Sequence, residues 1–202
     1  MSLLVQFFLT GLAVFLIAVA SYFFRHYRRA AHPRARSLYD TISFLRPLNL
    51  EDLEDVLDHT TETYLELNLP AHKFKDMQKM RTSRFLEHLG RMIHNSRFLS
   101  EWAHHERLTA WTNGDQELEA GCTELIRACI ETAGGVRSIQ FAILRWRMKK
   151  AMFPLAKVLH LAPLASFGSY NLLTAYERMA NAALALCHAL DPETEELLGQ
   201  SL

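Results

Sequence analysis

The pair Glu101 and His104 has the clearest potential for metal chemistry in this sequence. Side chains three residues apart on a helix share one face, and Glu-x-x-His pairs supply ligands in di-iron carboxylate bundles. Such sites also take a second Glu-x-x-His and two further glutamates from facing helices. The chain holds no second copy of the motif, which weakens the case for such a site. A carboxylate-histidine metal site at Glu101 and His104 is therefore the alternative hypothesis and not the leading one.

No other pattern indicates a reactive centre. The three cysteines, Cys122, Cys129 and Cys187, lack the second pair that a zinc site needs, and we expect reduced, buried thiols. The sequence contains neither a nucleophile elbow nor a glycine-rich phosphate loop. The leading expectation is therefore a non-catalytic protein without a cofactor.

A basic segment stands out from Arg137 to Lys157, which contains no acidic residue. Apolar side chains interleave with its cations, among them Arg145, Arg147, Lys149 and Lys150. This mixture is typical of a helix that touches an anionic membrane surface, although a solvated helix end is the simpler alternative. Nucleic acid is not favoured as a partner, because lysine plus arginine equals aspartate plus glutamate at 22 each and no nucleic-acid motif is present.

The first residues of the chain predict a transmembrane anchor. From Leu3 to Phe24 no side chain is charged, and a helix of that length, roughly 33 Å, spans a hydrocarbon core of about 30 Å. Arginines follow at once, and Arg25, Arg28 and Arg29 are expected to contact the membrane surface. By the positive-inside tendency the N-terminus faces out and the remainder is cytoplasmic. A cleaved signal peptide is the alternative, with Ala18 to Ala20 as the cleavage site, but it lacks a basic n-region.

The composition favours an all-α fold. Half of the residues are hydrophobic, whereas glycine and proline number only 8 and 6. We expect a single N-terminal transmembrane helix followed by a cytosolic antiparallel bundle of about four to five helices. The expected divisions are an anchor over residues 1–24, a basic juxtamembrane connector over 25–48 and the bundle over 49–202.

Helical spacing and capping residues place the expected elements. A short helical piece is expected at 38–45, and Asn49 is expected to cap a helix that ends at Asn68. The acidic face of that helix would pair with the basic face of the next one. The remaining predictions are a long helix that Asn95 and Ser96 break or bend, a helix after the loop 112–115, a helix over 171–190, and a frayed tail over the last ten residues.

These patterns together predict a membrane-anchored helical interaction module at the cytosolic membrane face, working as a scaffold, assembly factor or regulatory subunit. Its expected partners are the lipid bilayer through Leu3 to Phe24, a protein of unknown identity, and anionic lipid.

Overall fold

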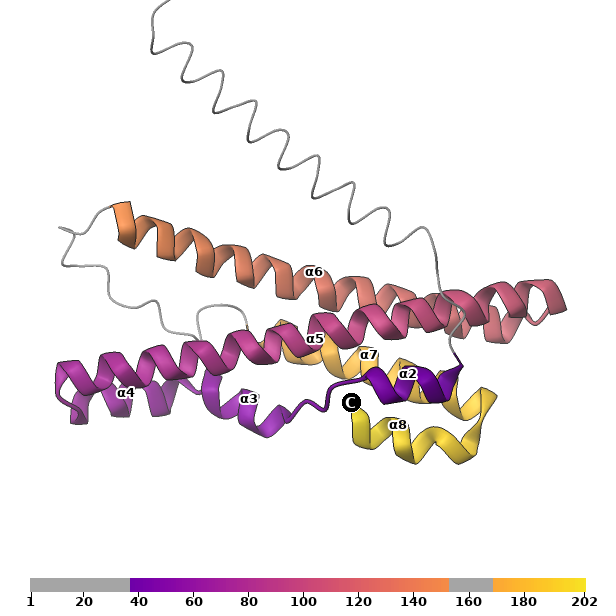
Figure 1. The fold of residues 1–202 in the computed structure, drawn as a ribbon, viewed down its shortest axis with the longest axis horizontal. Helices are drawn as coiled ribbons and strands as arrows, with labels where there is room; N and C mark the ends of the chain where they lie inside the picture. The colour runs from indigo at the N-terminus through magenta and orange to yellow at the C-terminus, as the bar shows by residue number, and fades with distance from the viewer. Residues whose placement is uncertain (1–36, 153–168) are drawn as a thin grey trace, which may run out of the picture. The chain divides into compact units, whose positions relative to one another are not determined.

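The computed structural model describes residues 37–152 and 169–202 (Figure 1). These residues belong to one compact unit, Arg36–Leu202, and form seven α-helices and one short 3-10 helix with no strand. The predicted all-α class is confirmed for this part of the chain, although seven helices exceed the expected number. The predicted anchor over residues 3–24 and the residues Arg25, Arg28 and Arg29 lie outside the described ranges. Within the described ranges, no helix combines the length and hydropathy needed to cross a bilayer.

Three long helices form the framework of the unit. Helix α5 (Ala71–Asn113) has 43 residues and is therefore about 64 Å long. A tight turn at Gly114 joins it to α6 (Gln116–Met152), which runs back along it. Gly114 has φ 74°, a left-handed conformation that glycine adopts without strain, and the side chain of Asp115 caps the new helix by accepting from the Leu118 amide at 3.0 Å. Helix α7 (Ser169–Leu190) packs against α6 and also touches α5.

The short helices lie around this framework (Figure 1). Helices α2 (Leu38–Phe44), α3 (Leu50–Leu57) and α4 (His59–Asn68) contact α5, and η2 (Pro192–Thr194) and α8 (Glu195–Ser201) contact α7. Fully buried side chains from the three long helices form the core between them: Phe85, Leu89, Met92, Leu99 and Trp102 of α5, Cys122, Leu125 and Val136 of α6, and Tyr176 and Met179 of α7.

A buried hydrogen-bond network around Asn95 ties the connector, α5, α7 and residue 202 together. The Asn95 carboxamide accepts from the Arg46 amide at 2.9 Å and donates to the Arg46 carbonyl at 2.9 Å. It also donates to the Tyr176 hydroxyl at 3.0 Å, which in turn donates to the Leu202 carbonyl at 2.9 Å. The Leu48 amide donates to the same carbonyl at 3.3 Å. Because Asn95 is fully buried, each bond replaces one that water would otherwise supply.

Helix α2 confirms the short helical piece expected after residue 37. The Ser37 hydroxyl caps it, accepting from the Asp40 amide at 3.1 Å. The Phe44 ring stacks on Phe98 of α5 with centroids 5.5 Å apart, and the Phe44 carbonyl lies 2.9 Å from Nε2 of His94. These contacts fix α2 to the side of α5.

The helix expected from Asn49 to Asn68 begins as predicted but is not continuous. The side chain of Asn49 accepts from the Asp52 amide at 3.1 Å, as a cap should. The helix then breaks at Asp58, which ends α3 and caps α4 by accepting from the amides of Thr60 and Thr61 at 3.0 and 2.9 Å. The guanidinium of Arg81 on α5 holds the break by donating to backbone carbonyls at the end of α3, including that of Val56 at 2.8 Å.

The capping role of Asp58 predicts acid sensitivity of α4. Hydrogen bonds from the Thr61 hydroxyl and amide, and then from the Thr60 amide, lower the pKa of Asp58 from 3.8 to about 2. Since the pKa is depressed in the folded state, the stabilisation is fully present above pH 3.8 and is lost as the pH falls through about 2. Hydrogen exchange of the α4 amides should therefore rise several-fold in Asp58→Ala at neutral pH. Asp58→Asn keeps one of the two acceptor oxygens without the titrating proton, so exchange should rise less than in Asp58→Ala and lose its acid dependence. Equal exchange in both variants and the parent protein would show that the cap is not needed.

Two further expectations are corrected. The break expected at Asn95 and Ser96 does not occur, because α5 runs through both residues: the Asn95 side chain bonds to the connector and Ser96 bonds to the Met92 carbonyl at 2.7 Å within the helix. The last ten residues are not a frayed tail. They form η2 and α8, and Leu198 is fully buried against the core.

Candidate interaction surfaces and the predicted metal pair

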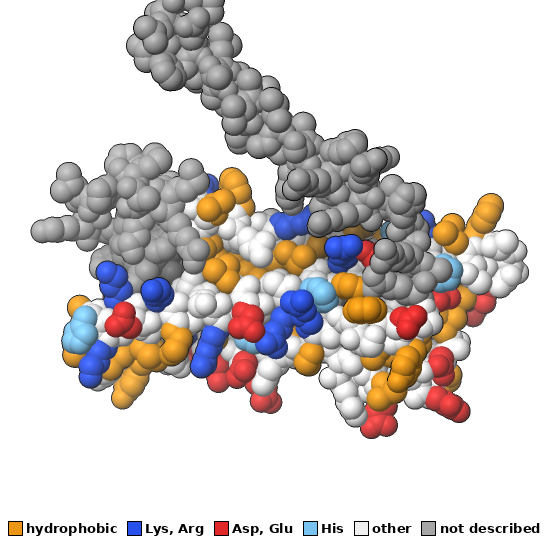
Figure 2. Space-filling view, viewed as in Figure 1, with side chains coloured by type: hydrophobic (Ala, Val, Ile, Leu, Met, Phe, Trp, Pro, Cys, Tyr) orange, Lys and Arg blue, Asp and Glu red, His pale blue; other side chains and the backbone are white. Residues whose placement is uncertain are grey.

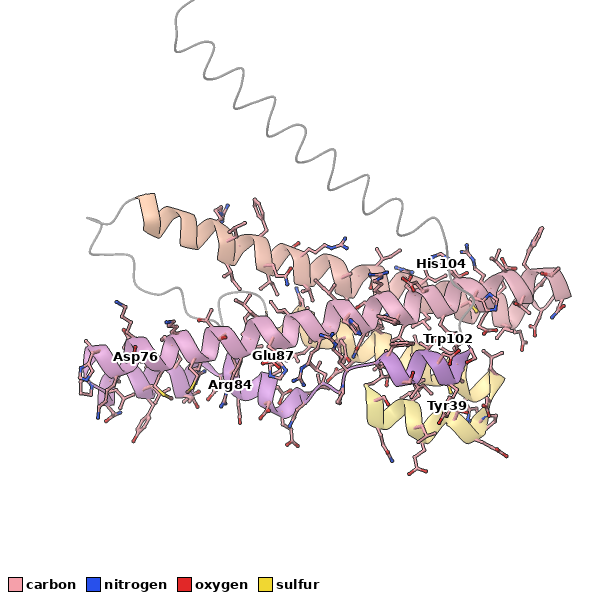
Figure 3. All side chains as sticks on the ribbon, viewed as in Figure 1. Tyr39, Asp76, Arg84, Glu87, Trp102 and His104 are labelled. Carbon is pink, nitrogen blue, oxygen red and sulfur yellow. The ribbon has the colours of Figure 1, made fainter. Side chains whose placement is uncertain are left out.

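Glu101 and His104 both lie on α5, but the described residues place no further ligand beside them. Oε1 of Glu101 accepts from Nε of Arg97 at 2.9 Å, so an ion pair occupies this carboxylate. His104 is exposed, and Figure 3 shows it and the buried Trp102 on different sides of α5. Partial desolvation, and then the nearby Arg107, lower the pKa of His104, which keeps its ring neutral. Over residues 37–152 and 169–202, no group of three His, Cys, Asp or Glu side chains is arranged to hold a metal ion. The metal hypothesis stays a prediction.

The three cysteines are buried, free thiols, as the sequence predicted. Burial raises the pKa of Cys129 to about 12, and burial together with Glu106 raises the pKa of Cys122 to about 11. Burial also raises the pKa of Cys187. Because the thiolate is the nucleophile, the raised pKa and the burial of each thiol both oppose reaction in the folded protein.

We expect none of the native thiols to react with a disulfide reagent such as DTNB until the protein unfolds. For Cys129 the thiolate fraction falls roughly a thousandfold when the pKa rises by three units, before restricted access is counted. Titration with and without denaturant measures the number of reactive thiols. We expect none of the three native thiols to react without denaturant and all three to react with it. A Gln116→Cys variant, at an exposed position of α6, should react at once and serves as the positive control. Rapid reaction of a native thiol would contradict its placement in the core.

The junction of α4 and α5 buries polar groups where apolar ones are expected. Glu62 is only 5% exposed and accepts from the Gln78 carboxamide, while its second oxygen has no hydrogen-bond partner. Nε of the buried Arg81 also lacks one. The sequence predicted that the acidic residues of 49–68 pair with basic residues of the next helix. Within the described ranges, however, no ion pair joins α3 or α4 to α5. The polar contacts between these helices are instead the Gln78 bond to Glu62 and the Arg81 bonds to backbone carbonyls, and Leu53, Val56 and Leu57 of α3 pack in the core.

As a consequence, α4 presents its apolar side chains outward. Tyr64 is exposed, and Leu67, one turn away, is 80% exposed. Figure 2 shows orange side chains standing out at the lower edge beneath α4. Neighbouring exposed apolar side chains on a helix of low burial indicate a surface that another molecule can cover. We call Tyr64 and Leu67 the α4 patch.

Helix α6 is apolar on two opposite faces. Val136, Ile139 and Ile143 are buried in the core, as their spacing predicted. Phe141 and Leu144 fall between them and face outward, 66% and 53% exposed. The sequence analysis did not predict that these two side chains form an exposed surface. The available signal was that neither residue follows the helical spacing of the buried ones.

The candidate membrane-contact residues of this helix are placed only in part. Arg145 is exposed next to Leu144. Arg147, Lys149 and Lys150 lie within the bounds of α6, but their side chains are outside what the structure describes, as are Arg25, Arg28 and Arg29 entirely.

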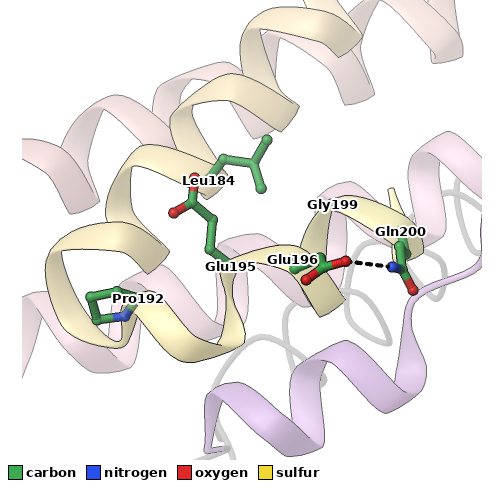
Figure 4. Close-up of a pocket in the computed structure, with 6 residues that line it drawn as sticks. All are labelled: Leu184, Pro192, Glu195, Glu196, Gly199 and Gln200. Atoms are coloured by element: carbon green, nitrogen blue, oxygen red, sulfur yellow. Dashed lines mark hydrogen bonds between the residues drawn. The ribbon is translucent and has the colours of Figure 1, made fainter.

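A shallow depression between α7 and α8 carries no chemistry that we can assign. Its walls are formed by Leu184, Pro192, Glu195, Glu196, Gly199 and Gln200 (Figure 4). The Gln200 carboxamide donates to Glu196 at 3.4 Å across its edge, and both side chains are exposed. Exposed glutamates without a buried partner do not make a binding site.

Comparison with known proteins returns no matching family model, no matching curated protein and no matching solved structure.

Proposed function

We propose that this chain is a membrane-anchored, non-catalytic helical interaction module on the cytosolic side of a membrane, acting as a scaffold, assembly factor or regulatory subunit. The uncharged apolar run from Leu3 to Phe24, followed directly by Arg25, Arg28 and Arg29, is the observation that carries the proposal. Behind it lies a separate compact helical unit, Arg36–Leu202, which the anchor would hold at the membrane surface.

Exposed apolar side chains support a role in binding. Single exposed apolar residues are ordinary, but the α4 patch and the pair Phe141 and Leu144 on α6 each place two large ones within a turn. A soluble helix that only packs on its own core normally keeps such residues off its outer face. We assign the α4 patch to the protein partner.

Membrane extraction and topology test the anchor. The full chain with a reporter after Leu202 should stay in the membrane pellet through an alkaline carbonate wash, and the reporter should be digested only when protease reaches the cytosolic face. Removing residues 3–24 should release the protein. A reporter outside the cell, or mature protein beginning near Ser21, would overturn the proposal.

A pull-down from native membranes tests the partner site. A protein that binds the α4 patch should co-purify with the full chain and be lost from the Tyr64→Ser and Leu67→Ser variants. The matched control is Leu197→Ser, which changes an exposed leucine of α8, 48% exposed, and should retain the partner. Equal recovery with every variant would remove the α4 patch as the binding surface.

Elemental analysis separates this proposal from the alternative, a helical-bundle metalloprotein using Glu101 and His104. The purified full chain should carry no stoichiometric transition metal. Stoichiometric iron, manganese or zinc that disappears in Glu101→Ala but remains in Glu117→Ala, an exposed glutamate of α6, would place the metalloprotein first.

A further inference from the structure

The outward face of α6 combines exposed apolar groups with positive charge. At 100° per residue, Phe141, Leu144 and Arg145 point away from the face that buries Ile139 and Ile143. Ile130 lies on the same outward side three turns earlier and is 65% exposed. The turns between Ile130 and Phe141 carry the exposed Gly134, Arg137 and Ser138 on this side, so the large apolar groups gather at the later end of the helix. We call Phe141, Leu144 and Arg145 the α6 outer stripe.

Beyond Glu131, the charged residues of α6 are all basic. After Glu131 the sequence contains no acidic residue until Glu177, whereas Arg145, Arg147, Lys149 and Lys150 crowd the end of the helix. The acidic residues of α6, Glu117, Glu119, Glu124 and Glu131, all lie toward its start. A surface that is apolar and basic in this way complements a bilayer with anionic headgroups, because the headgroup–acyl boundary accepts the apolar side chains while the cations meet lipid phosphates and carboxylates.

We propose that the α6 outer stripe docks onto the anionic surface of the membrane that holds the chain. Phe141 and Leu144 enter the headgroup–acyl boundary, and Arg145 with the basic run that follows contacts the lipid headgroups. This inference rests on the proposed function, because the anchor supplies the bilayer at high effective concentration and lets a weak surface contact be populated. Docking would fix the orientation of the bundle on the membrane and leave the α4 patch as a separate surface.

A spin label at position 144 tests the docking in the full chain. Leu144→Cys is labelled in proteoliposomes of phosphatidylcholine alone and of phosphatidylcholine mixed with phosphatidylserine, and collisions with oxygen and with a polar nickel chelate are measured. With phosphatidylserine present, oxygen collisions should rise and nickel collisions fall. A label at Gln116→Cys, exposed at the start of the same helix, should stay accessible to nickel in both vesicles.

Charge variants test the recognition of anionic lipid. Neutralising Arg145, Arg147, Lys149 and Lys150 to glutamine should return the label at position 144 to water, since each lost cation weakens the contact by about fivefold. The matched control neutralises Lys73, Lys75, Lys79 and Arg84, four exposed cations of α5, and should leave the label shielded.

The possible outcomes are distinguishable. A label that faces water in both vesicles, on a chain that still resists carbonate extraction, overturns the docking and leaves the anchor standing. Shielding that is equal with and without phosphatidylserine overturns recognition by charge, and dipolar broadening between labels shows instead that a second copy covers the stripe. A chain that washes off the vesicles overturns both the docking and the proposed function.

Discussion

Trp102→Ala should lower the free energy of unfolding by about 3–5 kcal/mol, the largest loss that we expect from a single substitution. Trp102 is fully buried in the middle of the core on α5, and its indole nitrogen donates to Glu106 at 3.2 Å. Truncation removes the apolar contacts of the largest fully buried side chain and leaves a cavity in the core. Urea unfolding of the full chain in detergent, followed by far-UV circular dichroism, measures the loss.

Trp111→Ala is the matched control, since the same residue type on the same helix is removed at a position that is 71% exposed. It should change the free energy of unfolding by no more than about 0.5 kcal/mol. Similar losses for the two variants would mean that Trp102 does not occupy the core position described here.

Asn95→Ala should lower the free energy of unfolding by about 2–4 kcal/mol. The substitution removes both bonds to the Arg46 backbone and the bond to the buried Tyr176 hydroxyl, which keeps its bond to the Leu202 carbonyl. The same unfolding experiment measures the effect. The control Asn181→Ala removes an exposed asparagine from the interior of α7 and should be close to neutral.

A double-mutant cycle shows whether Asn95 and Tyr176 act as one unit. Tyr176→Phe alone removes the hydroxyl that links Asn95 to the Leu202 carbonyl. If the network is cooperative, the double variant should lose less than the sum of the two single losses, by about 0.5–3 kcal/mol. Strictly additive losses would indicate two independent hydrogen bonds.

Local signals explain which parts of the fold could be predicted. Asn49 followed by acidic residues marks a helix start because the cap bonds to an amide only three residues away, and the structure has this bond. Pro192 after Asp191 marks the end of α7 for an equally local reason, since proline cannot continue the helix. The break at Asp58 has such a signal only in part, because the Asp58 cap explains where α4 starts but not why α3 ends. The break also depends on Arg81, which lies 23 residues further along the chain and supplies the donors for the carbonyls that the break exposes.

Surfaces and tails were harder to predict because packing decides them. The spacing of Val136, Ile139 and Ile143 identified the core face of α6, but only the arrangement of α5 and α7 shows that Phe141 remains outside. In the same way, Leu198 becomes a core residue because α8 folds back over α7. The charge of Glu62 predicts an exposed side chain, yet Glu62 is buried. Its hydrogen-bond partner there is Gln78, which lies on another helix.

The bond between the Leu48 amide and the Leu202 carbonyl has a consequence for the order of folding during synthesis. Helices α5 and α6 are neighbours in sequence, so their hairpin closes a short loop and can form while the chain is still growing. Leu48 leaves the ribosome earlier than that hairpin, but its amide finds its partner only when residue 202 has emerged. The first segment of the bundle therefore waits longest for its native contacts, and a slow codon or a chaperone acting late in translation should affect this joint before any other.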